Sequence, residues 1–531
     1  MTSGAGPNLL IFAPLRLEAS ALGRGAPSSR VVRTGGGARR ARRAAAQIEA
    51  GQFETAQIGT AQIGTGQFET GQQPTAAVAI AGFCGGLDER LSPGDVIVAS
   101  ELMGPGSGRV PLPSAALLGV ALRRRGLRVH QGPLVTVDHL VRGAERRELA
   151  EQGALAVDME SGVLAPALVA GAPLAVVRVV VDTPARELLR PGTLRNGLAA
   201  RAALRSVGAA LSDWAPAVMG ERQGGRRVLL ASPRSFCAGV DRAIATVEEA
   251  LGRFGPPVYV RRQIVHNTHV VADLESKGAV FVEELDEVPE EATVVLAAHG
   301  VAPTVRAQAE DNRLRVIDAT CPLVAKVHHE ARRFAASGHR IVLIGHHDHE
   351  EVQGTLGEAD DAISVVASPA EVDDLDLPPE QPVAFLTQTT LALDDVRDVV
   401  ERLRARRPDA EAPAADDVCY ASQNRQDAVR EVAHRAEVLL VVGSPNSSNS
   451  NRLAEVAERE GCRAHLVEDE TEVDPAWLAG ARVVGVTAGA SAPEVLVDRV
   501  VAAISGLGPI TVEEVAVTTE SVRFALPRMT S

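Results

Sequence analysis

The stretch Leu314-Arg-Val-Ile-Asp-Ala-Thr-Cys-Pro-Leu-Val324 joins an apolar run to a cysteine and a proline. The apolar residues predict a strand, and Pro322 fits the first turn of a helix over Leu323 to Ala336, because its missing N–H removes a donor that would be unpaired there. Cys321 is therefore expected at a corner between a strand and a helix.

Two other cysteines have a similar sequence context. Cys237 follows the apolar run Arg227 to Ser232 and precedes a helical pattern, and Cys419 follows Asp416-Asp-Val and precedes another helical pattern. The second half of the chain is therefore predicted to contain three copies of one α/β unit, each of which presents a thiol.

Length and composition favour a protein of several globular domains. The chain has 531 residues, of which 45% are hydrophobic and 23% charged, and this length predicts roughly three domains. The net charge of -14 and the aromatic content of 3% argue against nucleic-acid binding, which uses basic surfaces and aromatic stacking. No apolar run approaches the roughly 20 residues that span a membrane, and the N-terminus lacks the pattern of a signal peptide. We therefore expect a cytoplasmic protein without a membrane span.

The residues up to about Trp214 alternate short apolar strands with helical patterns, which is typical of an α/β domain. The predicted strands include Leu9–Ala13 and Ala175–Val181, and a closing helix covers Gly197–Trp214. Residues 51–70 contain four copies of a pentapeptide, too few to bury a core of their own, so we expect a surface loop at 47–75.

A Pro- and Gly-containing stretch from Pro216 to Gly225 predicts a domain boundary. We therefore divide the chain into an N-terminal domain at 1–215, a linker at 216–226 and a second domain at 227–531. The second domain is predicted to have lobes at about 227–320, 321–418 and 419–510, followed by a C-terminal tail.

Three places in the N-terminal domain could carry chemistry. Glu18 follows the first strand, the Gly-rich turn Thr34-Gly-Gly-Gly-Ala-Arg39 enters a helix and is suited to binding an anion, and carboxylates lie near strand ends in Asp158-Met-Glu-Ser161 and Arg178-Val-Val-Val-Asp182. Each signal alone is weak, because most Gly-rich turns are only turns and most lone carboxylates are only solvated.

Together these residues resemble the nucleoside phosphorylase and nucleosidase superfamily over about residues 8–214. The resemblance implies that Met159 and Glu160 bind the sugar of a nucleoside, that Asp182 protonates the purine leaving group, and that Glu18 positions the nucleophile. The sequence departs from the family in Val181, where a serine is usual, and in the pentapeptide loop.

In the second half, predicted strands end in polar clusters. Functional residues of α/β sheets gather at the carboxyl ends of strands, so three lobes around one axis would bring three thiols and six polar clusters to one cavity. The clusters are His266-Asn267, His299-Gly300, Gly345-His-His-Asp-His-Glu-Glu351, Thr387-Gln-Thr-Thr390, Ser444-Pro-Asn-Ser-Ser-Asn-Ser450 and Gly489-Ala-Ser-Ala-Pro493.

The cysteines favour a shared ligand over a disulfide framework, because the five in the chain are odd in number and widely spaced. A single free cysteine is most often a buried core residue, and we expect this of Cys84 and Cys462. Zinc favours closely spaced Cys pairs, which are absent, whereas three thiolates can hold a [4Fe–4S] cluster and leave one iron open. We therefore expect such a cluster on Cys237, Cys321 and Cys419.

The polar clusters indicate the chemical class of the substrate. Hydroxyl, amide and imidazole groups without a lysine suit a diphosphate that is bound by many directional hydrogen bonds. Glu351, beside His349 and the pair Thr389-Thr390, is the carboxylate best placed to move protons near the open iron. The predicted lining comprises His266, His299, Ser447, Ser448, Asn449 and Ser491.

From about Arg227 to Pro527 the ordered motifs closely resemble the 4-hydroxy-3-methylbut-2-enyl diphosphate reductase family. The motifs are Phe236-Cys-Ala-Gly-Val240, Val265-His-Asn267, Ala298-His-Gly300, Asp318-Ala-Thr-Cys-Pro322, Thr387-Gln-Thr-Thr390, Cys419-Tyr420, Asn446-Ser-Ser-Asn-Ser-Asn-Arg452 and Gly489-Ala-Ser-Ala-Pro493. One departure is Glu350, where the family usually has proline, and we expect that it could alter the turn that aims Glu351.

This resemblance implies a three-lobed, pseudo-threefold α/β fold around a [4Fe–4S] cluster and the last step of the non-mevalonate isoprenoid pathway. Two electrons and protons would remove the allylic hydroxyl and give isopentenyl and dimethylallyl diphosphates, with a donor such as ferredoxin or flavodoxin. By motif, Cys237, Cys321 and Cys419 hold the cluster; His349, Glu351 and Thr389 deliver protons; and His266, His299, His349, Thr390, Ser447, Ser448, Asn449 and Ser491 bind the substrate.

Two alternatives stay open at the level of sequence. The first is an enzyme that cleaves glycosidic bonds, whose C-terminal half only senses redox state. The second is an ordinary reductase whose N-terminal domain is a non-catalytic assembly module. If both halves are active, their product could be a terpenoid with a nucleoside-derived group, such as a hopanoid side chain.

Overall fold

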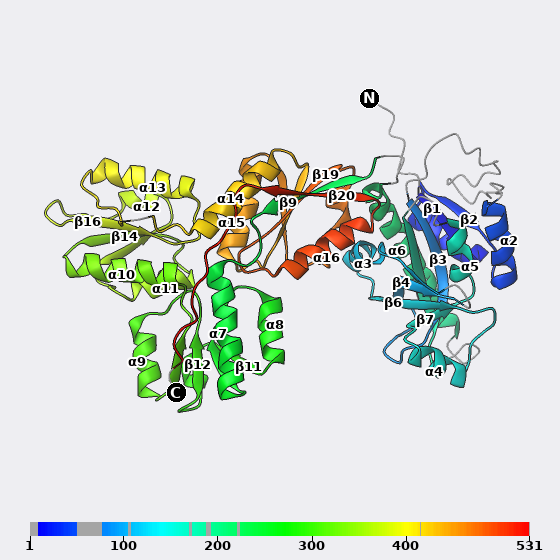
Figure 1. Cartoon of the computed structure of the whole chain (residues 1–531). Coiled ribbons are helices and arrows are strands. Elements are labelled where there is room, and N and C mark those ends of the chain that lie inside the picture. The colour runs from blue at the N-terminus through cyan, green and yellow to red at the C-terminus, as the bar shows by residue number, and fades with distance from the viewer. Residues whose placement is uncertain are drawn as a thin grey trace, which may run out of the picture. The chain divides into compact units, whose positions relative to one another are not determined.

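A computed structural model describes residues 9–49, 77–104, 108–168, 173–186, 193–219, 224–414 and 416–529 (Figure 1). The chain forms two compact units, which are described separately. The first comprises Met1–Val228, Asp469–Val484 and Asp498–Val512, and the second comprises Leu229–Glu468, Gly485–Val497 and Glu513–Ser531. Most of the predicted loop at 47–75 lies outside the described residues, and its first three residues are the end of a helix.

The N-terminal unit is built on a mixed eight-stranded sheet. The strand order is β2-β1-β3-β7-β6-β4-β5, and β8 pairs with β3 in parallel and with β4 in antiparallel orientation. The strands are β1 (Leu9–Ala13), β2 (Arg30–Arg33), β3 (Ala77–Gly86), β4 (Val96–Met103), β5 (Arg109–Pro111), β6 (Val129–Thr136), β7 (Ala156–Asp158) and β8 (Leu174–Asp182).

Helices cover this sheet, with α1 packed against α6 and α2 against α5. Strands such as β3 and β8 are nearly continuous apolar runs because helices bury both of their faces. The closing helix α6 begins four residues earlier than predicted. The helices are α1 (Arg16–Gly25), α2 (Ala38–Glu49), α3 (Ala115–Arg124), α4 (Ala144–Glu151), α5 (Ser161–Leu168), α6 (Thr193–Trp214) and the 3₁₀ helix Ala215–Ala217.

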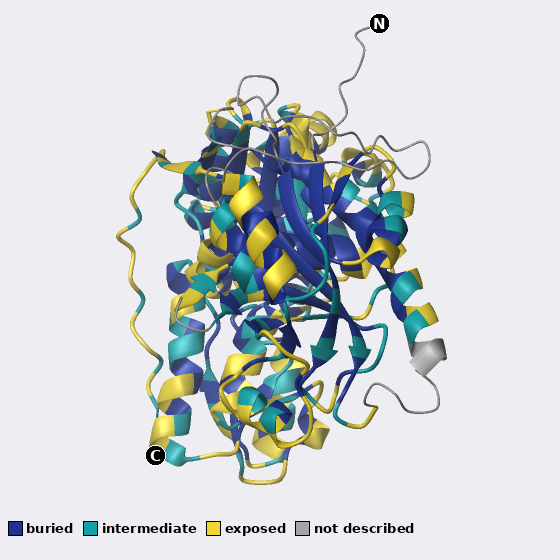
Figure 2. Ribbon diagram, turned by 90° about the vertical axis from the view of Figure 1, so that its right-hand side faces the viewer, coloured by how far each residue is buried: buried dark blue, intermediate teal, exposed yellow. Residues whose placement is uncertain are grey.

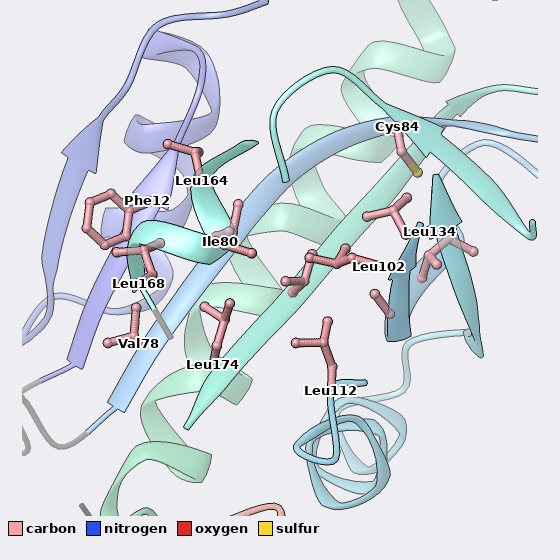
Figure 3. Close-up of a cluster of buried hydrophobic side chains, with 14 of the residues drawn as sticks. Phe12, Val78, Ile80, Cys84, Leu102, Leu112, Leu134, Leu164, Leu168 and Leu174 are labelled. Atoms are coloured by element: carbon pink, nitrogen blue, oxygen red, sulfur yellow. The ribbon is translucent and has the colours of Figure 1, made fainter. Parts of the chain in front are cut away.

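The core of this unit lies along the strands. They are buried, whereas the outer faces of the helices are exposed (Figure 2). Phe12, Ile80, Cys84 and Leu134 belong to one continuous apolar cluster (Figure 3). Cys84 is therefore a core residue, as the sequence predicts. The carboxyl ends of β7 and β8 carry Asp158 and Asp182.

The remaining strands form three separate sheets, which matches the predicted three-lobed α/β fold. Their orders are β11-β10-β12-β13, β15-β14-β16 and β18-β17-β19-β9-β20. The strands are β9 (Arg226–Ser232), β10 (Val258–Arg261), β11 (Ala279–Val282), β12 (Thr293–Leu296), β13 (Arg315–Asp318), β14 (Arg340–Ile344), β15 (Ile363–Val366), β16 (Val383–Thr387), β17 (Val438–Val442), β18 (Arg463–Val467), β19 (Val483–Ala488) and β20 (Ile510–Ala516).

Helices begin directly after all three predicted cluster cysteines. Cys237, Cys321 and Cys419 are the N-cap residues of α7, α10 and α14. The helices are α7 (Ala238–Phe254), α8 (Thr268–Ser276), α9 (Pro303–Asp311), α10 (Pro322–Ala336), α11 (Glu350–Leu356), α12 (Pro369–Asp373), α13 (Leu393–Arg406), α14 (Tyr420–Ala433), α15 (Ser448–Arg459) and α16 (Glu494–Ser505), with 3₁₀ turns at Leu285–Glu287 and Pro475–Leu478.

Each cysteine lies where the chain leaves one sheet and enters the next lobe. The strand β9 before Cys237 belongs to the third sheet, and β13 before Cys321 belongs to the first. The residues before Cys419 do not form the strand-like setting of the other two, because 416–418 are irregular and Asp417 is buried against Lys326. The three cysteines therefore occupy equivalent positions before a helix, but only Cys237 and Cys321 follow a strand closely.

None of the helices in the described part of the chain has the length and apolar character needed to cross a membrane.

Candidate functional site

The three thiols line one cavity within the second unit, together with the polar residues that follow the strands. The backbone N–H of each cysteine donates to a carbonyl beside a polar cluster: Cys237 to Ala490 at 3.3 Å, Cys321 to Ala298 at 2.9 Å and Cys419 to Thr389 at 2.8 Å. The cysteine corners and the polar clusters are thus tied together by the main chain.

The space between the thiols is kept open by a glycine. A Cβ atom at Gly239 would lie 2.7 Å from Sγ of Cys321 and 3.8 Å from Sγ of Cys237, so a side chain at this position would fill the room between the sulfur atoms. Three thiols around such a cradle are the ligand set of a soft metal or an iron–sulfur group. The residues present therefore fit a cluster that is held by three cysteines.

Burial and helix geometry act on these thiols in opposite directions. Burial raises the pKa of Cys321 to about 11 and that of Cys419 to about 12, although backbone N–H groups of the following helix turns lower both values. The N-termini of α10 and α14 thus favour the thiolates of Cys321 and Cys419, and a bound metal displaces the thiol proton. The cavity is therefore suited to thiolates that are bound to metal.

Three histidines form one wall of the cavity. The rings of His266 and His299 stack with centroids 4.1 Å apart, and His349 stands edge-on to both at 5.9 and 6.2 Å. Burial lowers the pKa of His266 to about 3 and that of His349 to about 4. These two imidazoles are therefore neutral at pH 7 in the absence of an anion.

Glu350 faces the same wall from the other side. Its Oε2 lies 3.4 Å from Nδ1 of His299 and its Oε1 lies 3.6 Å from Nη1 of Arg262. Burial alone would raise the Glu350 pKa, but the hydrogen bond and charge interaction with His299, followed by His266 and Arg262, lower it to about 2.

Single ligand atoms of His266, His299 and Glu350 lie within 4.8 Å of one another. The two stacked rings are only 20° from parallel and their centroids are 4.1 Å apart, however, and imidazole lone pairs lie in the ring planes, so the two rings are not oriented to share one ion. The group is better described as the charge pair of Glu350 and Arg262 beside the imidazoles of His266 and His299 than as a metal centre.

Glu350 lies in the first turn of a capped helix. His349 is the N-cap of α11, where its Nδ1 accepts the N–H of Glu351 at 3.2 Å, and Glu350 occupies the first helical position. Whether Glu350 alters the turn that aims Glu351, relative to proline, stays a prediction. A glutamate in the first turn also interacts favourably with the helix dipole.

Glu351 is a buried carboxyl group that is held by one residue. Its Oε1 accepts the backbone N–H of Thr389 at 2.7 Å and its Oε2 accepts the Thr389 hydroxyl at 2.9 Å. Burial raises its pKa, and the two hydrogen bonds from Thr389 only partly oppose this effect. Glu351 and Thr389 both line the cavity, so the structure brings this predicted pair to the thiols.

The hydroxyl and amide groups of the cavity wall are held by hydrogen bonds to one another and to the main chain. The Ser491 hydroxyl donates to the carbonyl of His266 at 3.0 Å and lies 3.3 Å from Oγ of Ser447. The hydroxyls of Ser448 and Thr390 are 3.0 Å apart, and Asn449 Oδ1 accepts the N–H of Ala490 at 2.9 Å. The groups are mutually oriented and present further donors to the cavity.

The N-terminal unit contains a second cavity, of about 480 Å³, into which its predicted residues converge. Glu18, Met159, Glu160 and Asp182 all line it. Glu18 accepts the N–H groups of Leu15 at 2.5 Å and Phe83 at 2.7 Å, and burial raises its pKa to about 7.

The Gly-rich turn is already occupied by a carboxylate of the protein. The N–H of Gly37 donates to Oε1 of Glu160 at 2.8 Å, and positive φ angles at Gly35 and Gly37 allow this approach. The predicted anion site in this turn therefore positions Glu160 for the cavity. Burial raises the Glu160 pKa, and the nearby charge of Arg178 lowers it again in part.

Two buried arginines, which the sequence analysis did not assign, balance these carboxylates. Arg178 is fully buried and pairs with Asp158 at 2.5 Å, and Arg146 pairs with Asp182 and donates to the carbonyl of Gly86 at 3.0 Å. Arg178 stands four residues before Asp182, but its partner is Asp158. Sequence spacing could not predict this, because β7 and β8 are separate strands of the sheet.

Comparison with known proteins adds a family assignment. Residues 228–505, just over half of the chain, match the model of the LytB protein family. The chain belongs to the LytB protein family. Residues 73–211 match the model of the phosphorylase superfamily, as the N-terminal resemblance predicts.

Close relatives of the LytB region are 4-hydroxy-3-methylbut-2-enyl diphosphate reductases. The protein from Acidothermus cellulolyticus is 57% identical over 303 residues, which cover 57% of this chain and 89% of the relative. The protein from Zymomonas mobilis is 54% identical over 301 residues, which cover 57% of this chain and 88% of the relative.

The structure of the E-1-hydroxy-2-methyl-but-2-enyl-4-diphosphate reductase from Plasmodium falciparum matches 57% of this chain and 96% of its own, with 35% identity and a TM-score of 0.55. The predicted family and the three-lobed fold are thereby confirmed.

Two residues that the sequence analysis did not assign contact the LytB site, and one of them lines the cavity. Ser422 lines it and accepts a hydrogen bond from Asn449 Nδ2 at 3.4 Å, and Gln388 donates to Ser448 at 3.2 Å and to Thr390 at 2.7 Å. Gln388 stands inside a quoted motif, but Ser422 carries no sequence signal beyond its place in the first turn after Cys419.

Proposed function

We propose that the LytB region reduces 4-hydroxy-3-methylbut-2-enyl diphosphate to isopentenyl and dimethylallyl diphosphates. The reaction breaks the allylic C–O bond, consumes two electrons and two protons, and releases water. The observation that carries the proposal is the convergence of three thiols, a buried carboxyl group and a diphosphate-type lining on one cavity.

Cys237, Cys321 and Cys419 would hold a [4Fe–4S] cluster. When bound by three thiolates, such a cluster supplies electrons and leaves one iron without a protein ligand. A one-electron carrier such as ferredoxin or flavodoxin would deliver the electrons. The remaining chemistry is the work of the polar residues.

The diphosphate would lie between the histidine wall and the hydroxyl network. His266, His299, Ser447, Ser448, Asn449 and Ser491 would donate to its oxygens, and Thr390 and His349 would complete the substrate contacts. Neutral imidazoles can each offer one N–H, and a nearby anion favours a second proton on the ring. Binding should therefore draw protons onto this wall.

Glu351 would deliver a proton to the departing hydroxyl. Its burial favours the protonated form, and a carboxylic acid in reach of a leaving group is an effective general acid. Thr389 would fix the orientation of this carboxyl group and relay the proton through its hydroxyl, which contacts Oε2. His349 would hold the turn in which Glu351 stands.

The decisive experiment is anaerobic purification with iron and sulfide counts, a visible spectrum and a turnover assay on the diphosphate. We expect one oxygen-sensitive cluster and reductive dehydroxylation, both of which Cys321→Ser should abolish. Stoichiometric zinc without iron or sulfide would contradict the proposed cofactor.

A second function is favoured by the N-terminal cavity. We propose that residues 1–215 form a separate domain, joined by a linker at 216–226, that cleaves the glycosidic bond of a nucleoside. Glu160 and Met159 would hold the ribose, Asp182 would face the departing base, and Glu18 would position the nucleophile. A base with a pKa of about 7 can accept a proton near neutral pH.

Release of free base from nucleosides, measured with and without phosphate, tests this second function. Activity should rise with pH through about 7 as Glu18 ionises. If calorimetry with nucleosides gives no binding, the role of an assembly module becomes the better account.

A further inference from the structure

Arg425 joins two of the cysteine corners through one buried side chain. Its Nε donates to the carbonyl of Ser235 at 3.1 Å, and its Nη2 donates to Ser235 at 2.7 Å and to Phe236 at 3.2 Å. These carbonyls directly precede Cys237, whereas Arg425 stands on α14, which begins after Cys419. Arg425 therefore fixes the corner of Cys237 relative to that of Cys419.

The backbone that Arg425 holds is a strained one. Ser235 has a φ of 58°, a left-handed conformation that residues with a side chain rarely adopt. Such a conformation persists only where neighbouring groups enforce it. Two bonds from Arg425 end on the Ser235 carbonyl, and the Ser235 hydroxyl donates to Glu494 at 2.5 Å. The path of the chain into Cys237 thus depends on this guanidinium.

Arg242 makes the corresponding link to the third corner. Its Nη1 donates to the carbonyl of Ala319 at 2.9 Å and to that of Thr320 at 3.0 Å, the two residues before Cys321. Arg242 stands in the second turn of α7, which begins after Cys237. The two arginines together connect all three corners.

Both arginines also bind the same C-terminal segment, residues 517–529, which we call the C-terminal strap. Nη1 of Arg425 donates to the Glu520 carboxylate at 3.0 and 3.3 Å, and Nε of Arg242 donates to the carbonyl of Ala525 at 2.9 Å. Asn424 adds a hydrogen bond to Glu520 at 3.0 Å. The strap runs as an extended segment from β20 past α7 (Figure 1).

Glu520 of the strap is the carboxylate partner of the buried Arg425 guanidinium. The Arg425 side chain is only 1% exposed, and a buried guanidinium that loses its carboxylate partner is strongly destabilised. The strap itself contains no helix or strand, and most of its residues are exposed. Its attachment therefore rests on a small set of contacts, which include the pair of Glu520 with Arg425, the electrostatic interaction of Arg523 with Asp241 and the packing of Met529 against the core.

We propose that the C-terminal strap sets the spacing of the three cysteine corners through Arg425 and Arg242, with Glu520 as a positioning residue for the cluster. The part that concerns the cluster rests on the proposed function.

Glu520→Gln in the full chain tests the proposal, with Glu431→Gln as the matched control. Glu431 is an exposed glutamate of α14 whose nearest cation, Arg435, is 4.0 Å away. In anaerobically reconstituted holoenzyme, a chelator should remove iron about tenfold faster from Glu520→Gln than from wild type or control, because a charged hydrogen bond to a buried group is lost. The decay of the visible cluster absorbance gives the rate.

A second measurement uses the protein without a cluster. Alkylation by iodoacetamide, followed for each cysteine by peptide mass spectrometry, should accelerate at Cys237 and Cys419 in Glu520→Gln. In Arg242→Gln it should accelerate at Cys237 and Cys321 instead. Cys84 and Cys462 are buried elsewhere and report global unfolding, so their rates should stay unchanged.

The two measurements separate the possible failures. Unchanged chelation and alkylation rates in Glu520→Gln would overturn the proposal, as would equal acceleration at all five cysteines. If wild-type protein takes up no cluster, the proposed cofactor fails, whereas the alkylation pattern still decides the role of the strap.

Discussion

Replacing Glu351 with glutamine should separate proton delivery from the architecture of the LytB cavity. The carboxyl group accepts the backbone N–H of Thr389 through Oε1 and the Thr389 hydroxyl through Oε2. In Glu351→Gln the amide oxygen can keep the first bond, and the hydroxyl can rotate to accept from the amide NH₂. Both hydrogen bonds survive, so the free energy of unfolding should change by less than about 1 kcal/mol.

Turnover should change far more than stability. An amide cannot donate the proton that leaving hydroxide needs, and general acids typically contribute about 10²–10⁴-fold to the rate. We expect kcat to fall by about this factor, with little change in KM for the diphosphate. Because burial raises the Glu351 pKa, the wild-type rate should fall as pH rises through that pKa, and the variant should lack this decline.

The assay is anaerobic turnover with a chemical reductant, after iron and sulfide counts have shown equal cluster content. Glu371→Gln is the control, because Glu371 is a glutamate that contacts His347 at 2.9 Å and is not among the residues of the cavity wall. Wild-type turnover in Glu351→Gln at equal cluster content would refute the role of Glu351 as the acid.

Three further predictions concern buried charges. Glu350→Pro should keep the turn before Glu351, since proline fits a first helical position. It should lower KM for the diphosphate by about three- to tenfold, because an anion beside the site is removed. A raised KM would show that the carboxylate instead organises His299 for binding. In the N-terminal domain, Asp182→Asn should chiefly lower kcat for nucleoside cleavage, whereas Glu160→Gln should weaken binding and turnover together. If both variants lower kcat equally and leave KM unchanged, the ribose contact assigned to Glu160 is contradicted. Arg178→Met should lower the free energy of unfolding of the domain by about 3–5 kcal/mol in denaturant titration, because it leaves buried carboxylates unpaired. A decrease below about 1 kcal/mol would show that those carboxylates take up protons instead.

The local features of this protein follow from its sequence. Pro322 after Cys321 predicts a helix start, and α10 begins at that proline. The apolar run Leu9–Ala13 predicts β1 with the bounds that the structure has. These features can be predicted because side-chain periodicity and backbone restrictions act over a few residues.

The polar residues of the LytB site were also predictable, but only as members of ordered motifs. Ser/Asn-rich segments usually cap helices, and Ser447 does cap α15 while its hydroxyl lies 3.3 Å from Ser491. Ser422 was missed because a serine inside a helical pattern carries no distinct signal. Asp182 was recognised, but its pairing with Arg146 was not, since Asp182 ends β8 and Arg146 comes from the helix α4.

The sequence by itself determined local features such as β1 and the start of α10 at Pro322, together with the three thiols and the family. Only the tertiary structure decided that β9 pairs into the third sheet, that Glu350 faces His299, and that Arg425 holds the carbonyl of Ser235. The physical reason is range. Strand propensity and helix capping are decided within a few residues, whereas Glu350 and His299 are 51 positions apart and Arg425 and Ser235 are 190 positions apart, so they become neighbours only when the core closes.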